Sequence, residues 1–158
     1  MARTTFKIEG FRELDATLGE LTKPTARNVM RRACIKALEP MAEIARDHAA
    51  ANNWSGALAG SITVSSRAAG YARRRGRKQN EVEVYMGPGG VGEAAPPQGS
   101  LQEFGTAHHP PQPSIRPAWD EGKDDLAPAV ASEMSSEIEK AAQRAARKQA
   151  RLIARNGG

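Results

Sequence analysis

The sequence predicts an α+β protein in which a small, mostly antiparallel sheet is packed by two N-terminal helices and followed by a long C-terminal helix. Two short stretches, 61–66 and 81–86, alternate apolar and polar residues as half-buried strands do. Two longer stretches, 22–50 and 117–154, place apolar residues three and four positions apart, which is the period of an amphipathic helix. The 158 residues have the length of a single domain.

The first predicted elements are a short strand and a short helix. Residues 4–9 alternate weakly, with Phe6 and Ile8 on one side, and this pattern predicts a strand that ends at Gly10. Apolar residues then recur at helical spacing over about three turns, which predicts the first amphipathic helix. These residues are Phe11, Leu14, Leu18 and Leu21.

The second helix, over about residues 22–50, is expected to be the main core helix. Thr22 and Pro24 suit its N-cap and first turn, because a hydroxyl can accept from a free backbone N–H and proline has no N–H to leave unpaired. Pro40 lies inside the pattern and is expected to bend the helix near Lys36. The predicted buried face consists of Val29, Met30, Ala33, Ala37, Met41, Ile44 and His48.

Two strands are expected to follow and to pair as antiparallel neighbours. Residues 55–58 are predicted to turn into the first strand, 61–66, and the second strand is predicted at 81–86. The apolar side chains expected to share a face are Ile62 and Val64 in the first strand and Val82, Val84 and Met86 in the second.

Positive charge is concentrated in two segments. The segment between the strands, 67–80, is too long and too charged for a tight hairpin turn, so we predict a projecting basic loop. Its basic residues are Arg67, Arg73, Arg74, Arg75, Arg77 and Lys78. The chain end, 140–158, also lacks acidic residues, and its basic residues are Lys140, Arg144, Arg147, Lys148, Arg151 and Arg155. These segments hold 12 of the 23 Lys and Arg residues, so the 18 Asp and Glu residues are in excess elsewhere. An acidic body with two basic appendages suits binding to nucleic acid or to an acidic protein surface.

The predicted domain organisation is a single α+β domain, 1–139, with a basic helical extension, 140–158. Within the domain, 87–120 is a Gly- and Pro-rich segment that we expect to be extended. In it, the short element from Leu101 to Phe104 is expected to return apolar residues to the core.

The final helix is predicted to begin near Pro117 and to end near Ala154. Phe104 and Trp119 are expected to be buried and to anchor the segment before it, because large aromatic side chains favour burial. Pro128 marks either a kink or a boundary between two helices. The apolar face of the final helix consists of Leu126, Val130, Met134, Ile138, Ala141, Ala145, Gln149 and Leu152, and after Ile138 it is nearly all alanine and buries little.

Four sequence motifs occur in order over roughly residues 6–120. They are KIEGFRELDATLGEL, RRACIKALEPMAEIAR, SGALAGSI, and EFGT followed by a Pro-rich run and RPAW. Together they resemble the phage tail-completion family, the head–tail joining proteins of tailed double-stranded DNA phages. The signature positions are Gly56, Leu58, Ser61, Glu103, Phe104, Gly105, Thr106, Pro113, Arg116, Pro117 and Trp119. Ser55 departs from the threonine expected before Gly56, although serine retains the hydroxyl.

The resemblance implies a structural virion protein of the phage neck or tail top, which completes the tail and joins it to the head as a homo-oligomeric ring. The implied partners are further copies of this chain, favouring a hexamer, together with neighbouring neck, tail-tube or tail-terminator proteins and packaged DNA, but no membrane. The implied location is the virion, with the host cytoplasm as the place of assembly. The basic residues of 67–80 and 140–158 are then the expected assembly contacts. A basic nucleic-acid-binding protein is the alternative.

No catalytic, metal or cofactor site is predicted. His108 and His109 are adjacent and point in different directions, whereas zinc needs three or four converging ligands, so we expect them at the surface or in an interface. Ser61 lacks the surrounding glycines of a nucleophile elbow. The glycines of 87–99 are not followed by the Lys-Ser/Thr pair and helix of a phosphate-binding loop.

His48 and Cys34 are two further residue types that can take part in catalysis. His48 is expected to be a capping or buried, hydrogen-bonded side chain, and Cys34 a small core residue, although its basic neighbours would activate the thiol if they approached it. A single cysteine cannot form an intramolecular disulfide. The sequence has no run of about 18 apolar residues and no apolar N-terminal stretch, so neither a transmembrane helix nor a signal peptide is predicted.

Overall fold

The computed structural model describes residues 19, 21–52, 56–66, 82–89 and 98–156. The strand predicted at 4–9, most of the first predicted helix and the basic loop 67–80 lie outside these residues. The described elements, in chain order, are α2 (Lys23–Asn52), α3 (Ala57–Ser61), β1 (Ile62–Ser65), β2 (Tyr85–Pro88), α4 (Gln98–Phe104) and α5 (Ile115–Asn156). A two-stranded antiparallel sheet beside long helices confirms the α+β class, and α5 is the predicted long C-terminal helix.

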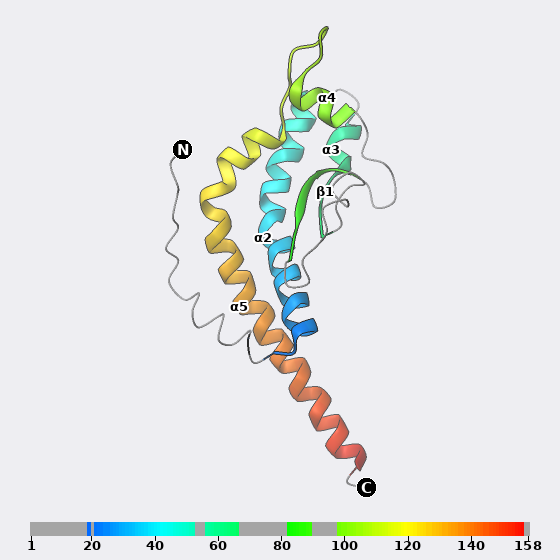
Figure 1. Cartoon of the computed structure of the whole chain (residues 1–158), viewed down its shortest axis with the longest axis vertical. Helices are drawn as coiled ribbons and strands as arrows, with labels where there is room; N and C mark the ends of the chain where they lie inside the picture. The colour runs from blue at the N-terminus through cyan, green and yellow to red at the C-terminus, as the bar shows by residue number, and fades with distance from the viewer. Residues whose placement is uncertain (1–18, 20, 53–55, 67–81, 90–97, 157–158) are drawn as a thin grey trace.

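The centre of the fold is an antiparallel pair of long helices, α2 and α5 (Figure 1). Alanines dominate the contact, which lets the two backbones approach closely, and a Cβ on Gly122 of α5 would lie 3.0 Å from Met41 Cε of α2. The main core cluster joins both helices to α3 and β1 through Met41, Ala42, Ala45, Ala49, Leu58, Ile62 and Ala118. A smaller cluster of Val29, Ile138 and Ala141 lies near the start of α2.

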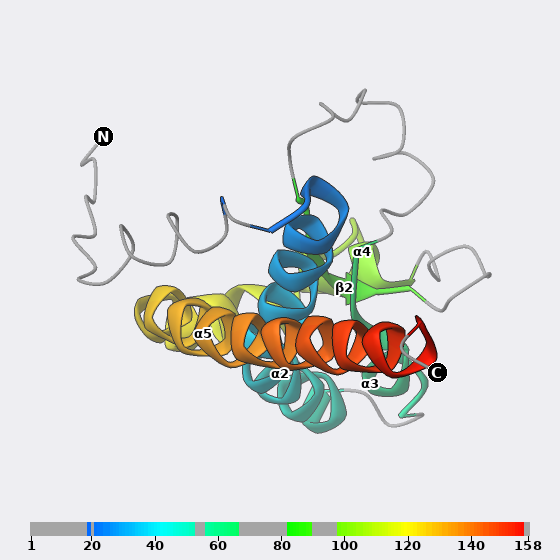
Figure 2. The ribbon, with the colours of Figure 1, turned by 90° about the horizontal axis from the view of Figure 1, so that it is seen from below.

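The predicted extent of α2 is confirmed, whereas the prediction of its buried face is confirmed only in part. Val29, Ala33, Ala37 and Met41 are buried, whereas Met30, Ile44 and His48 are only half-buried. Ala42, Ala45 and Ala49 are buried instead, because α2 is covered on two sides, by α5 and by the α3, β1 and β2 elements (Figure 2).

The predicted strand pair exists, but its boundaries were wrong. Residues 57–61 form α3 rather than a turn and the start of a strand, because Ala57, Leu58 and Ala59 are good helix formers and one helical turn buries Leu58. β1 and β2 pair with Ile62 opposite Pro88 and Ser65 opposite Tyr85. The pairing between the two described strands runs from Ile62 to Ser65 in β1 and begins at Tyr85 in β2, so Val82 and Val84 lie outside β2.

The prediction that 87–120 is one extended segment was also wrong, since it contains α4 and the start of α5. The prediction that Leu101 and Phe104 return to the core fails as well, because both side chains are exposed. α4 packs through Gly99 instead: an added Cβ there would lie 2.6 Å from Pro88 Cγ. Among the α4 residues whose burial is described, Gly99 and, one turn later, Glu103 are buried.

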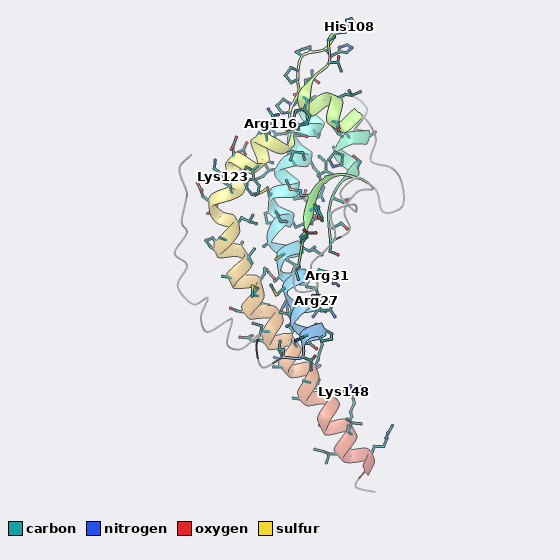
Figure 3. The ribbon with its side chains drawn as sticks, viewed as in Figure 1. Arg27, Arg31, His108, Arg116, Lys123 and Lys148 are labelled. Carbon is teal, nitrogen blue, oxygen red and sulfur yellow. The ribbon has the colours of Figure 1, made fainter. Side chains whose placement is uncertain are left out.

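α5 begins at Ile115, two residues before the predicted start, and continues past Pro128 to Asn156 as one helix. Its first turns run obliquely before the helix turns down beside α2, and Lys123 lies close to this bend (Figures 1 and 3). Pro128 cannot donate to the carbonyl of Asp124, which accounts for a kink here. Of the two alternatives for Pro128, a kink within one helix is the one observed.

Candidate assembly interface

The start of α5 is held by a buried carboxylate from α4. Glu103 is only 8% exposed, and its Oε2 accepts hydrogen bonds from the backbone N–H groups of Ser114, at 2.8 Å, and Ile115, at 3.0 Å. Its Oε1 accepts from the N–H of Arg116, also at 3.0 Å. A helix begins with backbone N–H groups that lack intrahelical partners. Glu103 therefore caps α5 from another element of the fold.

Pro117 completes this cap. The three residues before it give their N–H groups to Glu103, and Pro117 itself has no N–H to satisfy. The negative charge of a carboxylate is also favourable at the positive end of a helix dipole. The cap explains why glutamate and proline occur together in the EFGT and RPAW motifs: each removes unpaired donors at the same helix start.

The segment between α4 and α5 forms a projecting loop, residues 105–113, whose ends are tied together. Gly105 has a φ of +76°, and an added Cβ would lie 2.9 Å from Pro111 N and 3.0 Å from His109 O. The N–H of Gln112 donates to the carbonyl of Gln102 at 2.7 Å. Only glycine fits this close, left-handed turn without strain. The loop is thus fixed to α4 at its base.

Thr106 organises the tip of the projecting loop. Its N–H donates to the carbonyl of His109 at 2.9 Å, and its Oγ1 accepts from the N–H groups of His108, at 3.2 Å, and His109, at 3.1 Å. The side chains of 106–112 are exposed, and His108 lies at the outer end of the loop (Figure 3). The surface position predicted for the two histidines is confirmed. The half-buried Pro113 closes the loop before α5.

The expected aromatic anchors of this region are at the surface. Phe104 is 68% exposed and Trp119 is 49% exposed, so the prediction that they fix the segment to the core was wrong. Phe104 instead lies under the Arg116 guanidinium, whose carbon is 4.9 Å from the ring centroid, a cation–π contact across the loop base. Ser114 and Ala118 are the buried residues at this helix start.

The C-terminal end of α5 forms the second candidate surface. After Ala141 the described side chains are exposed, as predicted, and the helix continues past the start of α2 (Figure 1). We call residues 142–156 the overhang. At three- and four-residue spacing its basic residues form one row on the helix: Arg144, Arg147, Lys148, Arg151 and Arg155.

A buried charge cluster lies where the overhang leaves the body. Glu137 is 2% exposed, and its carboxylate accepts from Lys36 Nζ at 2.6 Å and from Arg32 Nε at 2.7 Å. Lys140 Nζ lies 3.7 Å from the same carboxylate. The hydrogen bond from Lys36, supported by Arg32, lowers the pKa of Glu137, and Glu137 in turn raises the pKa of Lys36. Sequence reasoning missed this cluster, although Glu137 follows Met134 at helical spacing on the buried face.

The remaining predicted positions have structural roles. Gly56 has a φ of +66° at the start of α3, Leu58 is buried, and Ser61 Oγ donates to Leu58 O at 2.8 Å, so Ser61 is bonded locally. His48 Nε2 lies 2.8 Å from Glu121 Oε1 and links α2 to α5. Burial raises the pKa of the half-buried Cys34 thiol, which opposes activation of this cysteine.

The described residues contain no group of three or more His, Cys, Asp and Glu side chains that could hold a metal ion. Among them there is also no helix that is both long and apolar enough to cross a membrane. The residues of the basic loop, Arg67 to Lys78, lie outside the described part of the chain.

Comparisons with protein-family models, with curated proteins and with solved structures find no match to this chain.

Proposed function

We propose that this chain is a structural protein of a phage neck or tail top, which assembles as a ring, completes the tail and joins it to the head. The observation that carries the proposal is the cap made by Glu103. This cap connects EFGT and RPAW, the two halves of the motif that resembles the tail-completion family. Together they fix both ends of the polar projecting loop. A protein that acts by docking can use such a cap to hold a contact loop in a fixed position.

The geometry of the projecting loop supports a docking role. Four of its residues are prolines or histidines in a row, His108 to Pro111, and the prolines restrict the backbone before any partner binds. A preorganised loop loses less conformational entropy on binding than a flexible one. The exposed Phe104, Arg116 and Trp119 surround its base, and aromatic and arginine residues often contribute most to protein interfaces.

The direct test is to locate the chain in particles of the phage whose genome encodes it. Antibody labelling and electron microscopy are expected to find it at the junction between head and tail. A variant in which residues 107–112 are replaced by glycine and serine is expected to leave separate heads and tails, while Ser132→Ala, on an exposed face of α5, is expected to give normal particles. Absence of the chain from purified virions would contradict the proposal.

The overhang favours one other function, binding of nucleic acid. A row of five exposed basic side chains on a helix can follow a phosphate backbone. In that case the affinity for DNA falls with salt: the slope of log K against log salt concentration is about −0.9 for each phosphate contacted, or roughly −4.5 for five contacts. Fluorescence anisotropy with labelled duplex DNA at several salt concentrations measures this slope. A slope near zero excludes this function for the overhang.

A further inference from the structure

Charge is segregated along both long helices. In α2, residues 23–36 carry five basic and no acidic residues, whereas 37–52 carry Glu39, Glu43 and Asp47 against Arg46 alone. In α5, residues 115–139 carry seven acidic and two basic residues, whereas 140–156 carry six basic and no acidic residues. Because the helices are antiparallel, their basic halves lie toward the same end, where Arg27, Arg31 and Lys148 are seen in Figure 3.

The packing of one chain neutralises only part of this charge. Near the basic end, Glu137 pairs with Arg32, Lys36 and Lys140. The five basic residues of the overhang form no ion pair with another described residue. At the acidic end Asp120 pairs with Lys123 and Glu121 with His48, but Asp124 and Asp125 have no such partner among the residues described. The basic end therefore keeps positive charges, and the acidic end keeps negative charges, that are not neutralised by other described residues.

One chain cannot bring these two sets together. Asp124 and Arg151 lie 27 residues apart on the same helix, which corresponds to about 40 Å at 1.5 Å per residue. Screening at physiological salt limits attraction between exposed charges to about 8 Å. Neutralisation of the overhang by the acidic start of α5 thus requires a second chain.

Apolar side chains accompany the basic row of the overhang. Ala145 and Leu152 continue the row that is buried at Ile138 and Ala141, and beyond the start of α2 they are exposed, as is Ile153. The overhang thus combines apolar contact area with a charge opposite to that of the acidic start of α5, as complementary interfaces do.

We propose that the overhang of one copy docks on the acidic start of α5 in the next copy, at Asp120, Glu121, Asp124 and Asp125. The two surfaces differ, so the contact is heterologous and repeats from chain to chain. Such a contact closes into a ring when its rotation allows and otherwise builds a filament. The inference rests on the proposed function only for the expectation that the series of contacts closes.

The test uses charge reversal in the full-length protein. The first variant carries Arg147→Glu and Arg151→Glu, and the second carries Asp124→Lys and Asp125→Lys. All four residues are exposed and lack ion pairs with described residues, so the fold is expected to survive, and circular dichroism checks this. Sedimentation velocity at physiological salt measures self-association. Asp47→Lys with Glu139→Lys changes net charge as much as the second variant does, but outside the proposed contact.

We expect each reversal to weaken self-association at least about tenfold. The chain with all four substitutions is expected to regain most of it, because its overhang is then acidic and its α5 start basic. If the wild type forms filaments that are lost in each reversal and recovered in the fourfold variant, the contact is supported but a closed ring is contradicted. A monomeric wild type, unchanged association in either variant, or no recovery in the fourfold variant overturns the inference. Loss of DNA binding in the first variant with unchanged self-association assigns the overhang to nucleic acid instead and also overturns it.

Discussion

The two ends of α5 are stabilised in opposite ways. At its start, a buried carboxylate from another helix satisfies the backbone, and Ser114 and Ala118 are buried against the rest of the fold. At its end, the described side chains of the overhang are exposed, and most of its residues are alanine, arginine, lysine and glutamine, which are strong helix formers. Tertiary structure fixes the first end, whereas intrinsic propensity maintains the second.

The difference matters because both ends belong to one continuous helix. A displacement of the capped start would move the overhang as well, since the helix joins them over its 42 residues. Substitutions at the start should therefore affect stability and assembly together. Substitutions in the overhang should affect assembly alone.

The largest expected effect is that of Glu103→Ala. The substitution leaves three backbone N–H groups at the start of α5 without their acceptor, and loss of such caps and charged hydrogen bonds costs about 3 kcal/mol. Glu103→Gln retains an acceptor oxygen and is expected to lose less, about 1 kcal/mol. Urea denaturation followed by circular dichroism measures both free energies of unfolding. Equal stability of Glu103→Ala and wild type would show that the cap does not hold this end.

The next largest effect is expected for Gly105→Ala. The added methyl group meets backbone atoms of Pro111 and His109 at a φ of +76°, and the strain is worth about 2 kcal/mol. Gly60→Ala is the matched control, because it lies in α3 with no atom within 4 Å of the new methyl group. In a helix this control is expected to stabilise by about 0.5 kcal/mol. The same denaturation experiment compares them, and equal effects of the two substitutions would contradict the close turn.

Glu137→Gln tests the cluster between the two ends. Its partners Arg32 and Lys36 are 43% and 42% exposed and remain hydrated, so we expect a loss of only about 1–2 kcal/mol at neutral pH. Because the folded pKa of Glu137 is lowered, its contribution is present above the ordinary carboxyl pKa of 4.5 and disappears as the pH falls through the folded value. The stability difference between wild type and Glu137→Gln should thus shrink below pH 4.5. A difference that stays constant down to pH 3 would exclude the ion pairs as its cause.

Much of the contrast between the capped start and the exposed end of α5 could be predicted from the sequence. Long periodic stretches gave both helices, and the loss of large apolar residues after Ile138 indicated an exposed end. The start of α5 was harder, because a large aromatic residue such as Trp119 normally favours burial, whereas a glutamate does not. Glu103 is buried only because three N–H groups from residues 11 to 13 positions later converge on it, and no local pattern encodes that convergence.

The short elements were missed for a related reason. Alternation around Val82 and Val84 is a proper strand pattern, but a strand is also defined by its pairing, and among the described residues the pairing with β1 begins only at Tyr85. Pairing with Pro88 at the other end of β2 gives no backbone N–H to the ladder and so carries no sequence signal for a strand. α4 likewise lies close to Pro88 at Gly99, and a single glycine in the sequence does not predict such a contact.

The smallest effect on stability is expected for removal of the overhang. Deletion from Arg144 onward takes away exposed side chains and leaves Ile138 and Ala141 in place, so the free energy of unfolding should change by no more than about 0.5 kcal/mol. An isolated helical stretch of this length is only marginally stable in water. Amide hydrogen exchange of the free protein should therefore be fast in the overhang and slow between Ala118 and Ala141. Self-association is expected to be lost in the truncated chain, and slow exchange that returns on self-association would identify the overhang as the contact. Equal protection of both stretches in the monomer would mean that the overhang is stabilised within its own chain, and the contrast between the two ends of α5 would fail.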